Sequence, residues 1–181
     1  MTIEFPNGTF DVIQADRPWR YNFSRSKSRS IEAHYPSMNI KDIQALGSRI
    51  PAADNCVLFL WATMPKLPEA LSVIEAWGFK LRTGILWNKM RIGMGYYVRS
   101  QCEELLVAEK GEMSPPVISE NLDLDYGVII EVKRDNKHSK KAEVTYEIIE
   151  KLYPNRRYLE LFARNESIRS GWSYWGNEAT S

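Results

Sequence analysis

The segment CVLFLWA, residues 56–62, is an uninterrupted apolar run. A strand with one face in solvent alternates apolar and polar residues, whereas a strand buried on both faces is apolar throughout. The run therefore predicts a central strand in a sheet that is covered on both sides. Further strands are predicted at 10–15, 81–88 and 103–109, at 126–132 as an edge strand, and at 156–163 as the last clear strand.

Helical patterns lie between these strands. Apolar residues recur at helical spacing from Pro65 to Trp77, and Gly78 follows at the expected end of the helix. Asn39 is a typical N-cap for a short helix, and 141–152 reads as a helix stopped by Pro154. Strands that alternate with helices predict an α/β fold, a mostly parallel sheet with helices on both faces, in a single domain spanning 1–181.

Composition excludes few functions. The net charge is only +1, although the stretches 17–30 and 133–141 are locally basic. Two histidines, and two cysteines without CxxC spacing, argue against a metal site or a disulfide scaffold. The chain has no apolar run of membrane-spanning length and no secretory leader, so we expect a cytoplasmic protein.

An acidic and aromatic tip, DRPW, follows the strand at 10–15. Ligands of parallel α/β sheets bind beyond the carboxyl ends of the strands, so these residues stand where a ligand is expected. The Asp16 carboxylate and a backbone carbonyl could accept the two hydrogens of an adenine amine, with an aromatic ring holding the purine. Taken alone, an Asp before Pro-Trp is more often a turn packed by an indole.

Six blocks in order carry a resemblance across nearly the whole chain: "FDVIQADRPWRY" (10–21), "HYPSMNIKDI" (34–43), "VLFLWATMPKLPEALSVIEAWGFK" (57–80), "ILWNKMRIGMGYYVRSQCEELLVAEKG" (85–111), "HSKKAEVTYEIIEKLYPNRRYLELFAR" (138–164) and "GWSYWGNE" (171–178). The sequence resembles the adenine-N6 methyltransferases with a DPPW motif, and the bacterial or phage branch most closely. The resemblance implies a Rossmann-like methyltransferase fold with permuted motif order and S-adenosylmethionine as the cofactor.

The resemblance also implies roles for individual residues. Asp16 would accept from the adenine amine and lie near the amino group of the cofactor, with the backbone carbonyl of Arg17 as second acceptor. Pro18 and Trp19 would shape the turn and the base pocket. Residues matching cofactor positions are Lys141, Glu160, Arg164, Asn177 and Glu178, with Leu161 and Phe162 alongside. Residues matching positions near the target nucleotide are Tyr35, Trp87, Lys89 and Glu103, and Arg99 belongs to the basic loop 89–99. Trp61, Trp77 and Trp175 are assigned to the core.

The chain departs from the family pattern at Arg17, where the family has the first proline of DPPW. Arg17 keeps a backbone carbonyl but adds a long cation, which could bind a substrate phosphate, pair with Asp16 or block the base. Two smaller departures are Ala142 in place of proline and Glu178 at a position often occupied by Gln.

The leading hypothesis is an adenine-N6 methyltransferase acting on nucleic acid, with DNA favoured over RNA because of the bacterial form and small size. The basic loops 17–30, 89–99 and 133–141 would hold the backbone. A catalytically inactive homologue that binds nucleic acid or a partner chain is the alternative, and a methyltransferase for a small substrate is a third. Target specificity would come from short loops, from a homodimer or from a heterodimer with a related subunit.

Overall fold

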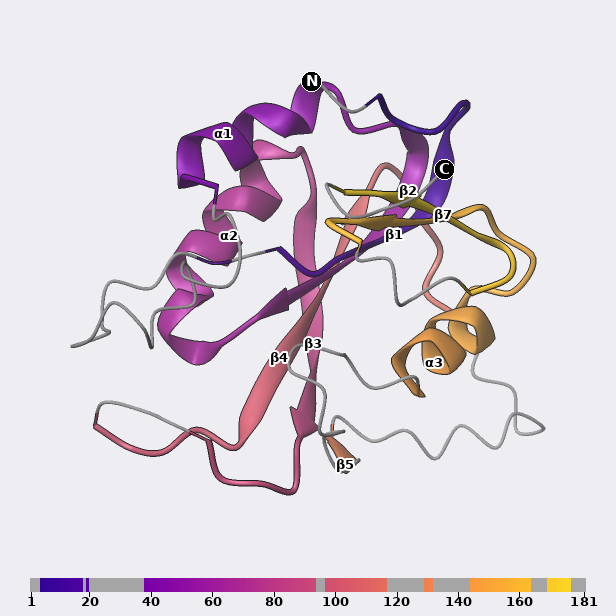
Figure 1. Cartoon of the computed structure of the whole chain (residues 1–181). Helices are drawn as coiled ribbons and strands as arrows, with labels where there is room; N and C mark the ends of the chain where they lie inside the picture. Colours follow the sequence, from indigo (N-terminus) through magenta and orange to yellow (C-terminus); the bar gives the residue numbers. More distant parts are fainter. Residues whose placement is uncertain are drawn as a thin grey trace.

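The computed structural model describes residues 4–17, 19, 38–93, 97–116, 129–131, 144–163 and 169–176. Within them seven strands form one sheet in the order β5-β3-β4-β2-β1-β6-β7 (Figure 1). The strands are β1 (Phe10–Ala15), β2 (Ala52–Ala62), β3 (Lys80–Asn88), β4 (Cys102–Lys110), β5 (Ile129–Glu131), β6 (Tyr158–Leu161) and β7 (Trp172–Trp175). Among these strands β4 runs antiparallel to its neighbours β2 and β3, and the other pairs are parallel. The predicted Rossmann-like α/β fold with a mostly parallel sheet is confirmed.

Different helices cover the two faces of the sheet (Figure 1). One face carries α1 (Ile40–Ala45) and α2 (Leu67–Ala76), accompanied by the 3-10 turns η3 (Leu46–Ser48) and η4 (Met64–Lys66). The other face carries α3 (Val144–Leu152). None of the described helices has the length and apolar character needed to cross a membrane.

The apolar run in β2 is explained by this two-sided packing. Leu58 and Leu60 pack in the cluster that contains Ile74 of α2. Phe59 and Trp61 pack in the cluster that contains Ile149 of α3. Since each buried side chain of this size contributes roughly 1.5–3 kcal/mol, β2 anchors both halves of the core. The predicted burial of 56–62 on both faces is confirmed.

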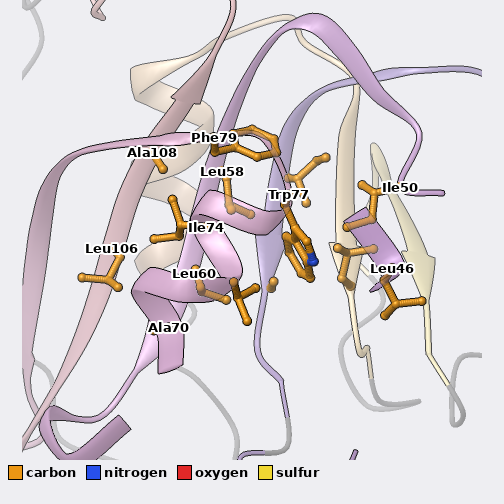
Figure 2. Close-up of a cluster of buried hydrophobic side chains, with 14 of the residues drawn as sticks. Leu46, Ile50, Leu58, Leu60, Ala70, Ile74, Trp77, Phe79, Leu106 and Ala108 are labelled. Carbon is orange, nitrogen blue, oxygen red and sulfur yellow. The ribbon is translucent and has the colours of Figure 1, made fainter. Parts of the chain in front are cut away.

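Trp77 joins the end of α2 to α1, and Figure 2 shows it within the cluster of apolar side chains on that face. Its indole Nε1 donates a hydrogen bond of 2.7 Å to the carbonyl oxygen of Ile43. Gly47 of η3 lies against the same ring, because a Cβ there would stand 2.7 Å from Cδ1 of Trp77. The core assignment of Trp77 and of Trp61, which are 4% and 1% exposed, is confirmed.

The predicted strand at 156–163 is present as β6, but it is not the last strand of the sheet. β7 follows it and pairs in parallel with β6, placing Tyr158 opposite Trp172. The sequence WSYW is only four residues long and lies between Gly171 and Gly176, so it lacks the apolar β-branched run by which the other strands were predicted. Aromatic residues nevertheless favour strands, and Trp172 stacks on Tyr158 at 5.0 Å between ring centroids.

The parallel strands place their carboxyl ends along one edge of the sheet. Asp16 follows β1, Thr63 follows β2, Lys89 follows β3 and Phe162 follows β6. The antiparallel β4 begins at this edge, so the loop from β3 to β4 returns to it. We refer to this edge as the carboxyl edge.

Replacing Trp77 by Ala should lower the free energy of unfolding by about 3–5 kcal/mol, because it removes a buried indole and its hydrogen bond. Denaturant unfolding followed by circular dichroism would measure the change. Leu71→Ala, on the same helix but 38% exposed, should cost less than half as much. Equal losses in the two variants would contradict this account of the α1–α2 face.

Candidate active site

Asp16 lies at the tip of β1, where the neighbouring strand β6 also ends. The backbone N–H of Asp16 donates to the carbonyl oxygen of Leu161 at 3.4 Å, extending the β1–β6 ladder by one bond. The Asp16 side chain is partly exposed. The predicted acceptor, Asp16, and the predicted cofactor segment around Leu161 are therefore brought together by direct strand pairing.

Trp19 anchors the segment that follows Asp16. Its indole is 6% exposed, and Nε1 donates a hydrogen bond of 3.0 Å to the carbonyl oxygen of Trp61 at the end of β2. The ring packs in the cluster on the α1–α2 face. The segment after β1 is thus bonded to the ends of both β2 and β6, and these bonds keep Asp16 in place.

The Arg17 side chain is buried, at 4% exposure, and does not extend into solvent. Its guanidinium carbon lies 3.7 Å from the centre of the Trp19 ring, a cation–π contact. The charge of Arg17 also acts on Glu69, in the first turn of α2. Partial burial acts to raise the pKa of Glu69, but the Lys66 hydrogen bond and the charges of Lys66 and Arg17 outweigh it, so the pKa is lowered. The stacking on Trp19 accounts for this side chain inside the fold, which favours a structural role over phosphate binding.

Glu160 brings a second carboxylate to the same region, on the face covered by α3. It is 6% exposed, and Tyr146 of α3 donates a hydrogen bond of 2.8 Å to its Oε2. Burial first, then the Glu160 carboxylate, raise the pKa of the Tyr146 phenol far above its ordinary value, and the charge of Asp16 adds to the effect. Tyr146 therefore lies within electrostatic reach of both carboxylates.

Gln14 is a polar residue inside the buried strand β1. It lies opposite Glu160 in the β1–β6 register and is fully buried. Neither its amide nitrogen nor its amide oxygen has a hydrogen-bond partner within the described residues. A buried amide is costly unless its donors and acceptor are satisfied, so Gln14 provides hydrogen-bonding capacity beside Glu160 for a polar group.

The chain makes a strained turn directly after β6. Phe162 adopts a φ of 63°, a left-handed conformation that is a genuine outlier for a bulky side chain. Its ring packs edge-on against Trp175, with the centroids 5.6 Å apart. Gly176 passes so close that a Cβ there would lie 2.5 Å from the Ala163 carbonyl oxygen. Such strain, of order 1–3 kcal/mol, is found most often at ligand sites.

A second group of predicted residues lies at the start of the β3–β4 connection. Lys89 Nζ and Glu103 Oε1 form an ion pair at 3.0 Å, and both side chains are largely buried. Trp87 is 2% exposed and packs edge-on against Trp61 at 5.8 Å. Arg99 is exposed, and its Nε donates to the carbonyl oxygen of Gly93 at 3.0 Å.

The remaining predicted site residues lie outside the described part of the chain. They are Pro18, Tyr35, Lys141, Arg164, Asn177 and Glu178. Two residues at the site were missed by the sequence reasoning. Gln14 could have been found as a polar residue within the apolar stretch that leads to Asp16, whereas Tyr146 lies in an ordinary amphipathic helix and carries no such signal.

The arrangement joins two carboxylates on adjacent strand ends, together with a phenol, an amide and a strained backbone turn. Ionised carboxylates are acceptors only, so they suit ligands that present amine or hydroxyl hydrogens. In an open α/β sheet, the crevice beyond the carboxyl ends is also where nucleotide-like ligands bind. The described residues contain no group of three or more metal-ligating side chains.

Comparison with known proteins places the chain among methyltransferases. A model of the MT-A70 family matches residues 10–178. The type II methyltransferase M.MunI of a Mycoplasma species is 32% identical over 97% of this chain and 80% of its own length. The N(6)-adenosine-methyltransferase MT-A70-like protein of Arabidopsis thaliana is 29% identical over 94% of this chain but only 24% of its own length. The human N(6)-adenosine-methyltransferase catalytic subunit METTL3 is 28% identical, again over 94% of this chain and 28% of its own.

The raised pKa of Tyr146 predicts a loss of stability in alkali. Below pH 10 the phenol is protonated in both states, but above it only the unfolded chain releases the proton. The free energy of unfolding should therefore fall with rising pH, by up to about 1.4 kcal/mol per pH unit from this residue. Denaturant unfolding of Tyr146→Phe between pH 8 and 11 should show a shallower decline than the wild type. Identical slopes would contradict the assignment.

Proposed function

This chain belongs to the MT-A70 family and is a methyltransferase, and from that premise we propose that it transfers the methyl group of S-adenosylmethionine to the N6 amine of adenine in nucleic acid. Relatives named N(6)-adenosine-methyltransferases support the choice of acceptor. DNA is the preferred substrate. That preference rests on the match of this chain to most of the length of the Mycoplasma relative, which is named a type II methyltransferase.

The observation that carries the proposal is the joining of Asp16 to the end of β6 through the bond to Leu161. An adenine amine is a poor nucleophile because its lone pair is delocalised into the ring. The Asp16 carboxylate and the Arg17 backbone carbonyl accept its two hydrogens and direct the lone pair toward the methyl donor. Alignment of this kind accelerates a reaction by proximity and orientation. The Asp16 carboxylate then takes the proton that the methylated amine loses.

The residues around β6 fit S-adenosylmethionine by their chemistry. Glu160 and Gln14 together supply acceptors and donors for ribose hydroxyls and for the amino acid end. The close approach of Gly176 to Ala163 and the strained turn at Phe162 shape the backbone there. When bound, the cofactor supplies an electrophilic methyl group. From the family pattern, Lys141, Arg164, Asn177 and Glu178 complete the set, with Leu161 alongside.

The target nucleotide is assigned to the carboxyl edge between Asp16 and the Lys89–Glu103 pair. The buried pair lies next to the contact between Trp87 and Trp61, and together they form a rigid surface against which a base can pack. In the family pattern Tyr35 matches a position near the target nucleotide, and Pro18 and Trp19 match positions that shape the tip. Arg99 belongs to the basic loop 89–99, which would hold the backbone. An adenine in a duplex reaches such a site only when it is flipped out of the stack.

Methyl transfer from radiolabelled cofactor tests the proposal directly. Asp16→Ala should lower the rate at least about 100-fold, because it removes the acceptor that orients the amine. Glu75→Ala, an exposed acid on α2, serves as the matched control and should retain activity. Substrates should include DNA and RNA, single- and double-stranded. Transfer to RNA alone would contradict the proposal of DNA as the substrate. Transfer to free adenosine at a rate that does not change with salt concentration would indicate a small substrate.

Replacing Arg17 by Ala separates the side chain from the backbone. We expect a loss of about 1–2 kcal/mol in the free energy of unfolding, since the cation–π contact and its packing disappear. Methyl transfer measured well below the unfolding temperature should remain, because the proposed acceptor is the backbone carbonyl. Unchanged stability with abolished transfer would instead assign the guanidinium itself to the reaction.

A further inference from the structure

The connection between β3 and β4, residues 89–101, exposes an unusual amount of apolar surface. Four of the eight large hydrophobic side chains that are exposed in the described residues lie on it, namely Met90, Ile92, Tyr97 and Val98. Tyr97 is 94% exposed and Val98 is 79% exposed. We call this segment the β3–β4 loop. Exposed apolar residues scattered singly need no explanation, but a cluster of this kind marks an interaction site.

Hydrogen bonds give the described part of the loop a defined form. Lys89 N–H donates to the Gln101 carbonyl oxygen at 3.0 Å, which closes the base of the loop. Further out, Gly93 N–H donates to the Ser100 carbonyl oxygen at 2.7 Å. The Nε of Arg99 donates back to Gly93 at 3.0 Å, bracing the two sides against each other. These bonds order the described flanks of the loop, on one of which the exposed side chains of Tyr97 and Val98 lie.

The charge of the loop identifies the kind of partner. Residues 89–101 contain Lys89, Arg91 and Arg99 and no acid. Lys89 is paired with Glu103, but Arg91 has no hydrogen bond or ion pair to a described residue. Arg99 uses only Nε in its described contact, so its terminal amino groups remain for a ligand. Two arginines beside exposed apolar side chains match a phosphate backbone that flanks a base stack.

The position of the loop connects it to the reaction. It starts where β3 ends, at the carboxyl edge that also carries Asp16, and it returns there at the start of β4. Its base contains Lys89, which lies close in sequence to the buried Trp87, and Trp87 packs against Trp61 of β2. The carbonyl oxygen of Trp61 accepts the hydrogen bond from Trp19, in the segment that follows β1. A duplex that presents one base to Asp16 would lie along this edge with its neighbouring bases at the loop.

We infer that the β3–β4 loop inserts Tyr97 and Val98 into the base stack that the target adenine leaves, while Arg91 and Arg99 bind the flanking phosphates. Flipping a base leaves its neighbours unstacked, and aromatic or apolar side chains that fill the gap restore part of the lost stacking. The inference rests on the proposed function, since it needs a substrate in which adenine is stacked. It adds a specific element that opens the duplex.

The double variant Tyr97→Ser with Val98→Ser tests the inference. Methyl transfer is measured on a duplex and on the single strand of the same sequence, and the duplex-to-single-strand rate ratio should fall at least about tenfold. A mismatch opposite the target adenine, which lowers the cost of flipping, should restore most of the ratio. Leu81→Ser, at an exposed apolar position on β3, is the matched control and should keep the wild-type ratio. An unchanged ratio in the double variant overturns the inference.

Binding gives a second readout that does not depend on catalysis. A duplex with 2-aminopurine at the target position should brighten with the wild type, as the base unstacks, and stay dim with the double variant. Replacing Arg91 and Arg99 by Gln should reduce the slope of log affinity against log salt by about 2.

If the wild type transfers methyl to no nucleic acid, the proposed function fails, and the 2-aminopurine signal still decides on the loop. If the double variant instead changes the sedimentation of the free protein, the loop is a subunit contact and the inference is overturned.

Discussion

The parallel pairing of β1 with β6 is the constraint on which the rest of the site depends. It joins the first strand of the chain to one of the last, and the bond from Asp16 to Leu161 continues the ladder to the strand tips. A shift of β1 by one residue against β6 would turn Gln14 and Asp16 to the opposite face, away from α3 and from Glu160. The buried aliphatic residues next to them in the two strands, such as Ile13 and Leu159, oppose such a shift, because it would take a side chain out of the apolar cluster in which it packs. Core packing thus determines where the two carboxylates stand.

The tip motif combines two physical roles that its sequence alone does not distinguish. Trp19 is a structural anchor, since it is buried and bonded to the Trp61 carbonyl oxygen. Asp16, three residues before that anchor, keeps a partly exposed carboxylate. Arg17 replaces the stiffness that proline would give with a stacked cation on Trp19. The turn is therefore braced by a side-chain contact where the family uses a fixed backbone dihedral.

Most of the fold could be predicted from the sequence because its central strands are apolar on both sides. The run at 56–62 indicates a two-sided core directly, and Asn39 indicates the start of α1 through the cap that accepts from the Asp42 N–H. β7 could not be predicted in this way, because WSYW forms a strand through pairing with β6 and stacking of Trp172, which are tertiary effects. At the site, Asp16 and Glu160 were predicted from the motif and its place at strand ends. Tyr146 depends on how α3 docks, and the burial of Arg17 depends on the position of Trp19; neither can be read from local pattern.

The reversal of β4 has a consequence for how proteins with this sheet diverge. Because β3 and β4 pair as an antiparallel hairpin, both ends of their connection are held at one place, by the bond between Lys89 and Gln101. Insertions, deletions or wholesale exchange of the outer residues leave the strand register untouched, since nothing beyond that closing bond is needed to align the ladder. The outer part of this connection can therefore vary in length and sequence between related proteins while β3 and β4 keep their pairing.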